Sequence, residues 1–348
     1  MMPVSDNPPL PLHSAELGGI DALMRRLCEE STNRELGRLA WEHIGSGGKR
    51  LRARLAVQAV VAQGAPAAHG VAWGAACELL HNASLIHDDI EDGDRFRRGR
   101  PSLWARHGVA QAINAGDLCI ALSYAAIAEV PVPDAVRWGL TATMTRAARH
   151  IAEGQAAELS LLSSGLPSWS RYAACVEGKT SALFALPAEG AALIAGRSMQ
   201  DAQGLADACR KLGVLFQVQD DILDLLGDNG RDQPGSDLSQ CGKVTALVVE
   251  HLRLHPGDAA WLLPVLLSPR ADTSPVQVAQ IIDRFVAGGA LSAVWQRIDD
   301  IVRELAESPV IRSQPALAAL VQDFVTAALR PVMHTRPAAE HSMLRPAG

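Results

Sequence analysis

Two acidic clusters in the chain have the same spacing, Asp-Asp-x-x-Asp, at residues 88–92 and 220–224. On a helix, residues one and four positions apart lie on one face, so the carboxylates of each cluster gather there. Carboxylates packed so closely require a cation, and a hard dication is the usual solution. One such cluster is more often a solvated helix end, but two embedded in apolar sequence indicate a metal site. Because Mg²⁺ completes its shell with phosphates and water, the pair predicts a phosphate-bearing ligand.

Basic residues that could meet such a ligand stand beside glycines in three segments, Gly47 to Arg52, Arg95 to Gly99 and Gly178 to Thr180. Glycine permits close approach of the backbone to a ligand. Each segment alone is typical of a solvated loop. The formal net charge of −6 means that an anionic ligand must be met by a local patch.

The elements that carry these residues are expected to be helices. Long stretches free of proline, such as Leu12 to Ala65 and Asp134 to Leu166, are rich in Ala, Leu, Glu and Arg, whereas hairpin signals are rare. We expect roughly ten to twelve helices in an all-α fold. Ser274 and Ser313 stand ahead of prolines as predicted helix caps. Pro187 interrupts a helical pattern and predicts a kink.

The composition sets the domain organisation and excludes several classes. With 348 residues, 48% hydrophobic and 20% charged, the chain is neither a disordered protein nor a basic nucleic-acid binder. We predict a disordered arm at residues 1–13, one domain at 14–330 and a flexible tail at 331–348. No signal peptide or membrane span is predicted, and the six scattered cysteines suggest reduced, buried thiols in the cytoplasm.

The ordered motifs resemble those of the trans-isoprenyl diphosphate synthase (polyprenyl synthetase) family, most of all its geranylgeranyl diphosphate synthases. The match covers most of residues 40–250: Gly-Gly-Lys-Arg-x-Arg at 47–52, the first Asp-rich motif, Arg-Arg-Gly at 97–99, Gly-Lys-Thr at 178–180 and the second Asp-rich motif. The resemblance implies a single large helical bundle around a central apolar cavity. It also implies a homodimer, with isopentenyl diphosphate and allylic prenyl diphosphates as substrates.

The family pattern also implies a role for each matching residue. The predicted metal ligands, for three Mg²⁺ ions, are Asp88, Asp92 and Asp220, supported by Asp89, Asp221 and Asp224. The residues predicted to bind the allylic diphosphate are Arg97, Lys179, Thr180, Gln217 and Lys243, and those for isopentenyl diphosphate are Lys49, Arg52, His81 and Arg98. The residues predicted to be catalytic are Asp88, Asp92, Lys179 and Asp220. Metal and cationic side chains would stabilise departing pyrophosphate, the isopentenyl double bond would attack the allylic cation, and a proton would be lost.

The family pattern also bears on product length, since bulky aromatics shortly before the first Asp close the tunnel. Here those positions hold Ala83 and Ser84, which favours the C20 product geranylgeranyl diphosphate, with Tyr124 as a candidate floor. A lone Tyr on an apolar helix is more often ordinary core. A farnesyl or longer-chain synthase is the alternative.

The sequence differs from the family pattern at two positions, and two other classes of protein remain open. Asp232 stands where the family has lysine, and Glu158 where it commonly has Asp. A terpene cyclase would share the acidic motifs but needs no second diphosphate site. An inactive regulatory subunit would have lost them.

Overall fold

The computed structural model describes residues 12, 14–226, 235–239, 243–268 and 273–337, and within these ranges the chain is helical apart from one short hairpin. The predicted all-α bundle is confirmed. Asp232, most of the N-terminal arm and residues 338–348 lie outside the described residues.

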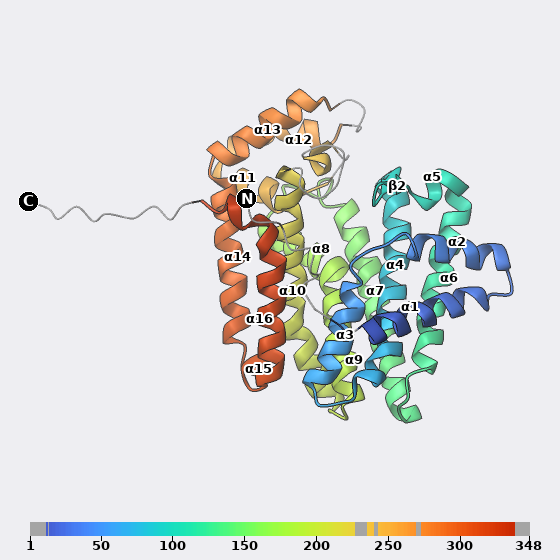
Figure 1. Ribbon diagram of the computed structural model, residues 1–348. Helices are drawn as coiled ribbons and strands as arrows, with labels where there is room; N and C mark the ends of the chain where they lie inside the picture. Colours follow the sequence, from blue (N-terminus) through green and yellow to red (C-terminus); the bar gives the residue numbers. More distant parts are fainter. Residues whose placement is uncertain (1–11, 13, 227–234, 240–242, 269–272, 338–348) are drawn as a thin grey trace, which may run out of the picture.

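The first nine helices form the half of the bundle that is drawn in blue to green in Figure 1. They are α1 Ser14–Glu29, α2 Arg34–Ile44, α3 Leu51–Ala62, α4 Ala67–Glu91, α5 Leu103–His107, α6 Val109–Ala128, α7 Asp134–Leu159, α8 Trp169–Val176 and α9 Ala182–Ile194. The antiparallel hairpin β1 (Phe96–Arg97) and β2 (Arg100–Pro101) follows α4. A π-helical turn, Glu177–Ser181, joins α8 to α9.

The other half runs from yellow to red in Figure 1 and packs beside the first through α10. Its α-helices are α10 Met199–Leu226, α11 Ala246–Leu254, α12 Ala259–Leu266, α13 Pro275–Ala287, α14 Ala290–Glu307, α15 Pro309–Arg312 and α16 Pro315–Leu329. Short 3-10 turns lie at Ser236–Ser239, Pro256–Asp258 and Arg330–Thr335. Val332 is fully buried, so packed chain continues past residue 330, into the segment predicted to be a tail.

The described helices outnumber those expected, because the chain also breaks where no proline marks the end. Asn33 caps α2 with a hydrogen bond from Leu36 N to its side chain, and a glycine-rich loop separates α2 from α3. The predicted cap at Ser274 is confirmed as a capping box with Gln277. The one at Ser313 is wrong: Gln314 occupies the cap position of α16, and the Ser313 hydroxyl bonds back to the Val310 carbonyl.

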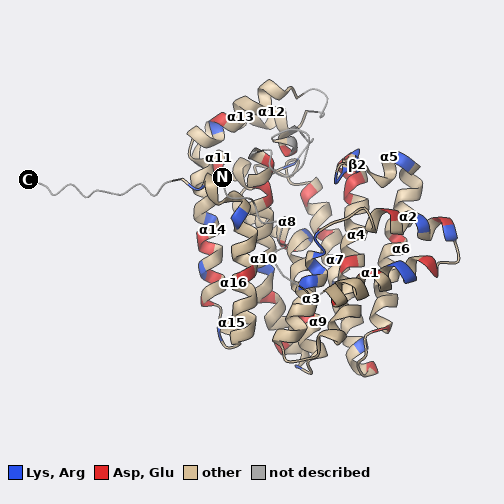
Figure 2. Cartoon of the chain, viewed as in Figure 1, with Lys and Arg blue, Asp and Glu red and all other residues tan. Residues whose placement is uncertain are grey.

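Apolar side chains fill the core along the long helices, whereas charged residues lie along the helices as well as in the loops (Figure 2). One described segment, Pro315–Thr335, has the length and a mean hydropathy of 1.3 that a membrane span would need, with 44% of its most apolar window buried in the bundle. It packs against α3, α10 and α14, and buried core helices pass the same test.

Candidate active site

The two Asp-rich motifs lie at the C-terminal ends of two long helices, α4 and α10. The π-turn Glu177–Ser181 lies between α7 and α10 because glycines let both helices approach its backbone. A Cβ atom at Gly154 of α7 would lie 2.3 Å from the Lys179 nitrogen, and one at Gly213 of α10 would lie 2.3 Å from the Ser181 Cα. This close packing fixes where Lys179 and Thr180 point. Pro187 lies inside helix α9. The departure from regular α-helix in this stretch is the π-helical turn Glu177–Ser181, which precedes α9.

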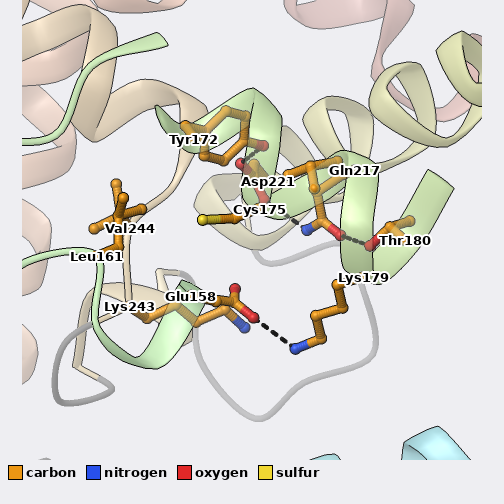
Figure 3. A pocket seen from close by; sticks show the side chains of 11 residues that line it. Glu158, Leu161, Tyr172, Cys175, Lys179, Thr180, Gln217, Asp221, Lys243 and Val244 are labelled. Atoms are coloured by element: carbon orange, nitrogen blue, oxygen red, sulfur yellow. Dashed lines mark hydrogen bonds and ion pairs between the residues drawn. The ribbon is translucent and has the colours of Figure 1, made fainter. Parts of the chain in front are cut away.

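Lys179 is the centre of an ion-pair cluster at the first motif. Its Nζ donates to Glu158 Oε2 at 2.7 Å (Figure 3). The same nitrogen lies 3.6 Å from Asp88 Oδ1. Burial alone would lower the pKa of Lys179, but the carboxylates of Asp88, Glu158 and Asp92 together raise it. The lysine is therefore cationic and held between α4 and α7.

Burial raises the pKa of Asp88 to about 6, and only partly is this offset by Lys179. Burial likewise raises the pKa of Asp92, although Lys243 and Lys179 lower it. These shifts mean that the first motif holds its negative charge at a cost, which a bound cation would relieve.

Two carboxylates of the second motif, Asp221 and Asp224, already accept hydrogen bonds from the protein. Asp221 is buried, and its Oδ2 accepts hydrogen bonds from the Tyr172 hydroxyl and the Ala246 N–H, both at 2.7 Å. Its Oδ1 accepts from Gln217 Nε2 at 3.0 Å (Figure 3). Burial raises the pKa of Asp221 to about 7 despite these donors. Asp224 Oδ2 accepts from the Asp237 N–H at 2.9 Å.

Side chains of α7, the π-turn and α10, among them Glu158, Lys179 and Asp221, line a hollow between these elements (Figure 3). It brings together five of the predicted substrate or metal residues: Lys179, Thr180, Gln217, Asp221 and Lys243. Thr180 donates to Gln217 Oε1 at 3.0 Å, and Lys243 Nζ lies 2.9 Å from Asp237 Oδ1. Tyr172 is a lining residue that no spacing in the sequence could identify, whereas Glu158 was visible as a departure from the family.

A second group of cations lies around the loop before α3 and the hairpin β1–β2, and Arg52 of this group contacts the Phe216 ring of α10. Arg98 donates to the Ser46 hydroxyl at 3.3 Å and also to the Gly47 carbonyl, while Lys49 is exposed. Arg52 is buried with its guanidinium 4.7 Å from the Phe184 ring. Burial lowers the pKa of Arg52 to about 10.

His81 and Arg97 lie next to this group. Burial, with Arg52 and Arg98 nearby, lowers the pKa of His81 well below its ordinary value, so the imidazole is neutral. Its Nδ1 is buried without a hydrogen-bond partner among the described residues. Arg97 Nε donates to Asp89 Oδ1 at 2.6 Å and so links the hairpin to the first motif.

The residues predicted to set product length lie on α4 and α6. Ala83 is 1% exposed, and the Ser84 hydroxyl turns back to the His81 carbonyl at 2.8 Å. The Tyr124 hydroxyl lies 3.2 Å from Thr145 Oγ1 of α7. Gly116 of α6 packs on the ring of His87, the residue before Asp88. Tyr124 follows Gly116 on the same helix, and the helical rise places it about 12 Å further along α6.

A buried histidine beside the second group makes stability depend on pH. Burial holds the pKa of His43 at about 3, and Arg97, Arg98 and Arg50 act in the same direction. The unfolded chain takes up a proton below the ordinary value of 6.5, so between these values the unfolded state binds more protons. The free energy of unfolding therefore falls as pH drops below 6.5, by about 2 kcal/mol at pH 5 for this residue.

When the pH falls from about 7.5 to 5, we expect the free energy of unfolding of His43→Gln to decrease by about 2 kcal/mol less than that of the native protein. Urea unfolding at both pH values measures this difference. The exposed His334→Gln is the matched control. An equal loss in His43→Gln and the native protein would contradict the buried neutral state.

Carboxylates from two helices beside two groups of cationic side chains are typical of a class of protein that binds phosphorylated ligands. The match to known proteins agrees with this class. Residues 33–284 match the family model described as polyprenyl synthetase, and the chain belongs to that family of prenyltransferases.

Relatives and a solved structure cover most of the chain. It is 32% identical over 311 residues to a short chain isoprenyl diphosphate synthase of Methanothermobacter thermautotrophicus, which covers 88% of this chain and 94% of that one. It is 34% identical to a (2E,6E)-farnesyl diphosphate synthase of Mycobacterium tuberculosis, with 74% of each covered. The crystal structure of a geranylgeranyl pyrophosphate synthetase from Pyrococcus horikoshii matches with a TM-score of 0.77 at 28% identity, covering 89% of this chain and 96% of that one.

Proposed function

We propose that the protein condenses isopentenyl diphosphate with an allylic diphosphate and releases geranylgeranyl diphosphate. The observation that carries the condensation is the presence of two separate cationic groups. One is centred on Lys179 between Asp88 and Glu158, and the other joins Lys49, Arg52 and Arg98 around the loop before α3. A terpene cyclase binds one diphosphate and needs only the first group. Both acidic motifs are present, which argues against an inactive regulatory subunit.

The donor set of the acidic motifs fits Mg²⁺. Mg²⁺ takes one or two protein carboxylates and would complete its shell with water and substrate phosphate oxygens. In this proposal Asp88, Asp92 and Asp220 hold the ions. Bound Mg²⁺ would supply charge that stabilises pyrophosphate as it leaves.

Asp221 has a different part in the proposal, because its oxygens already accept three hydrogen bonds from the protein. It orients Gln217 and the end of α10 and so places Asp220. Asp89 does the same for Arg97 through their ion pair. Asp224 secures the segment at Asp237, and these three supporting carboxylates act mainly through the chain's own structure.

Lys179, Thr180, Gln217, Lys243 and Arg97 bind the allylic diphosphate in this proposal. Lys179 exchanges Glu158 for a phosphate oxygen, so that its positive charge faces the leaving group. Lys49, Arg52 and Arg98 bind isopentenyl diphosphate, and His81 remains neutral beside them. The buried ring of Phe184 and the partly buried ring of Phe216 around Arg52 help keep water from a carbocation.

The C20 product is proposed from the small residues Ala83 and Ser84, which leave room below the first motif. Tyr124, held by Thr145, is the candidate floor. The names of the relatives span farnesyl to octaprenyl synthases, so product length is the part that most needs a test.

A homodimer in the cytoplasm completes the proposal. Val109 and Ile113 of α6 and Trp138 of α7 expose large apolar side chains, with Trp138 75% exposed, and a second copy would cover them. The described cysteines, Cys28, Cys77, Cys119, Cys175 and Cys209, are free and buried, as predicted for a reducing compartment.

The test is incubation of the purified protein with Mg²⁺, isopentenyl diphosphate and, separately, C5, C10 and C15 allylic diphosphates. Product length is then read after phosphatase treatment. A C20 alcohol is expected with each substrate. A C15 or longer product would keep the condensation and refute the floor, whereas hydrocarbons formed from the allylic substrate alone would indicate a cyclase.

A further inference from the structure

Arg50 stands beside Lys49 in the sequence, but its side chain turns into the protein. Its Nε donates to Asp21 Oδ1 of α1 at 2.9 Å, and its Nη2 donates to the Ile44 carbonyl at 2.9 Å. Its Nη1 lies 3.4 Å from the Gly47 carbonyl. The residue is 8% exposed, so one guanidinium joins α1, the end of α2 and the loop that leads to α3.

The backbone of that loop needs such support. Gly47 and Gly48 have φ angles of 115° and 118°, which glycine tolerates, but Arg50 itself has a φ of 50°. A left-handed conformation is unfavourable for a residue with a Cβ. Hydrogen bonds from the same side chain to fixed carbonyls and to Asp21 offset this cost and hold the turn in one shape.

The shape of the loop decides where the neighbouring cations lie. The Lys49 carbonyl accepts a hydrogen bond from Arg54 Nε at 2.8 Å, which fixes the backbone at Lys49, and the residue is exposed. Arg98 bonds to the Gly47 carbonyl, and a Cβ atom at Gly48 would lie 2.8 Å from Arg98 Nη2. The position of Arg98 therefore depends directly on the path of the loop.

We propose that Arg50, anchored by Asp21, is a positioning residue that aligns Lys49 and Arg98 for the diphosphate of isopentenyl diphosphate. This rests on the proposed function. Arg50 itself does not contact the substrate. The effect is selective, because Lys179, Thr180 and Gln217 come from the π-turn and α10, which lie outside this loop.

The first test uses Asp21→Asn, because the Asp21 side chain is 47% exposed and its change leaves the core intact. We expect the KM for isopentenyl diphosphate to rise about tenfold, with kcat and the KM for the allylic substrate unchanged. Asp134→Asn is the matched control, since Asp134 pairs with Arg137 at 2.9 Å on an exposed surface.

Arg50→Lys provides a second variant that keeps the charge but loses the forked geometry. We expect the same selective rise in KM, and the double variant with Asp21→Asn is expected to be no worse than Arg50→Lys alone. Equal rises in both KM values, or additive effects in the double variant, would overturn the proposal. A merely structural role would lower the melting temperature without this split.

Calorimetric titration with inorganic pyrophosphate, in the presence of EDTA, separates this inference from the proposed function. Weaker binding by Asp21→Asn than by the native protein would support the positioning role even if the native protein formed no condensation product. Unchanged pyrophosphate binding together with an unchanged KM for isopentenyl diphosphate would overturn it, whether or not C20 product is formed.

Discussion

Asp88→Ala is expected to lower kcat by about a thousandfold or more, because charge stabilisation by a carboxylate-held metal is worth several kcal/mol. Asp220→Ala is expected to have an effect of the same order from the other helix. Steady-state kinetics with Mg²⁺ and both substrates measures each loss. The two carboxylates lie on α4 and α10, so equal sensitivity would show that both helices serve the same reaction.

Stability provides the control for this prediction. Burial raises the pKa of Asp88 to about 6, so removing the carboxylate relieves a desolvation cost and the melting temperature should stay equal or rise. Asp134→Ala, at a 97% exposed side chain, should change neither activity nor stability. Near-normal turnover in Asp88→Ala or Asp220→Ala would refute the metal assignment.

Ala83→Phe is expected to change the main product from C20 to C15. Ala83 lies five positions before Asp88 on α4 and is 1% exposed, so a phenyl ring at this position would project into the interior. The growing chain would then meet the ring early, so elongation would stop at farnesyl diphosphate. Product analysis after phosphatase treatment, with isopentenyl diphosphate in excess, measures the change.

Adding a large side chain to a packed helix costs about 1 to 3 kcal/mol, so folding must be checked by the melting temperature. Ser84→Phe, at a partly buried position, offers a milder version of the same block. Ala68→Phe adds the same ring to an exposed position of α4 and should leave product length unchanged. Unaltered C20 output from folded Ala83→Phe and Ser84→Phe would exclude this part of α4 as the determinant.

The helical class and the chemistry of the two acidic motifs follow from the sequence. Periodic spacing places carboxylates such as Asp88 and Asp92 on one helix face whatever the helix packs against. The basic segments were found for a similar local reason, because Lys49 and Lys179 stand beside glycines. Helix number was underestimated, since the ends of α2 depend on the Asn33 cap and a glycine loop and not on proline.

Only the tertiary structure decided which of these residues pair with other protein groups and which stay available to a ligand. Within the second motif, Asp221 differs in role from the other carboxylates because it accepts a hydrogen bond from Tyr172 of α8. These two residues are far apart in the chain. Likewise Glu158 meets Lys179 only because Gly154 lets α7 approach the π-turn. Arg50 looks like another substrate-binding cation in sequence, yet its partner Asp21 lies on α1. Spacing determines which side chains share a helix face, whereas long-range packing determines which of them stay available to a ligand.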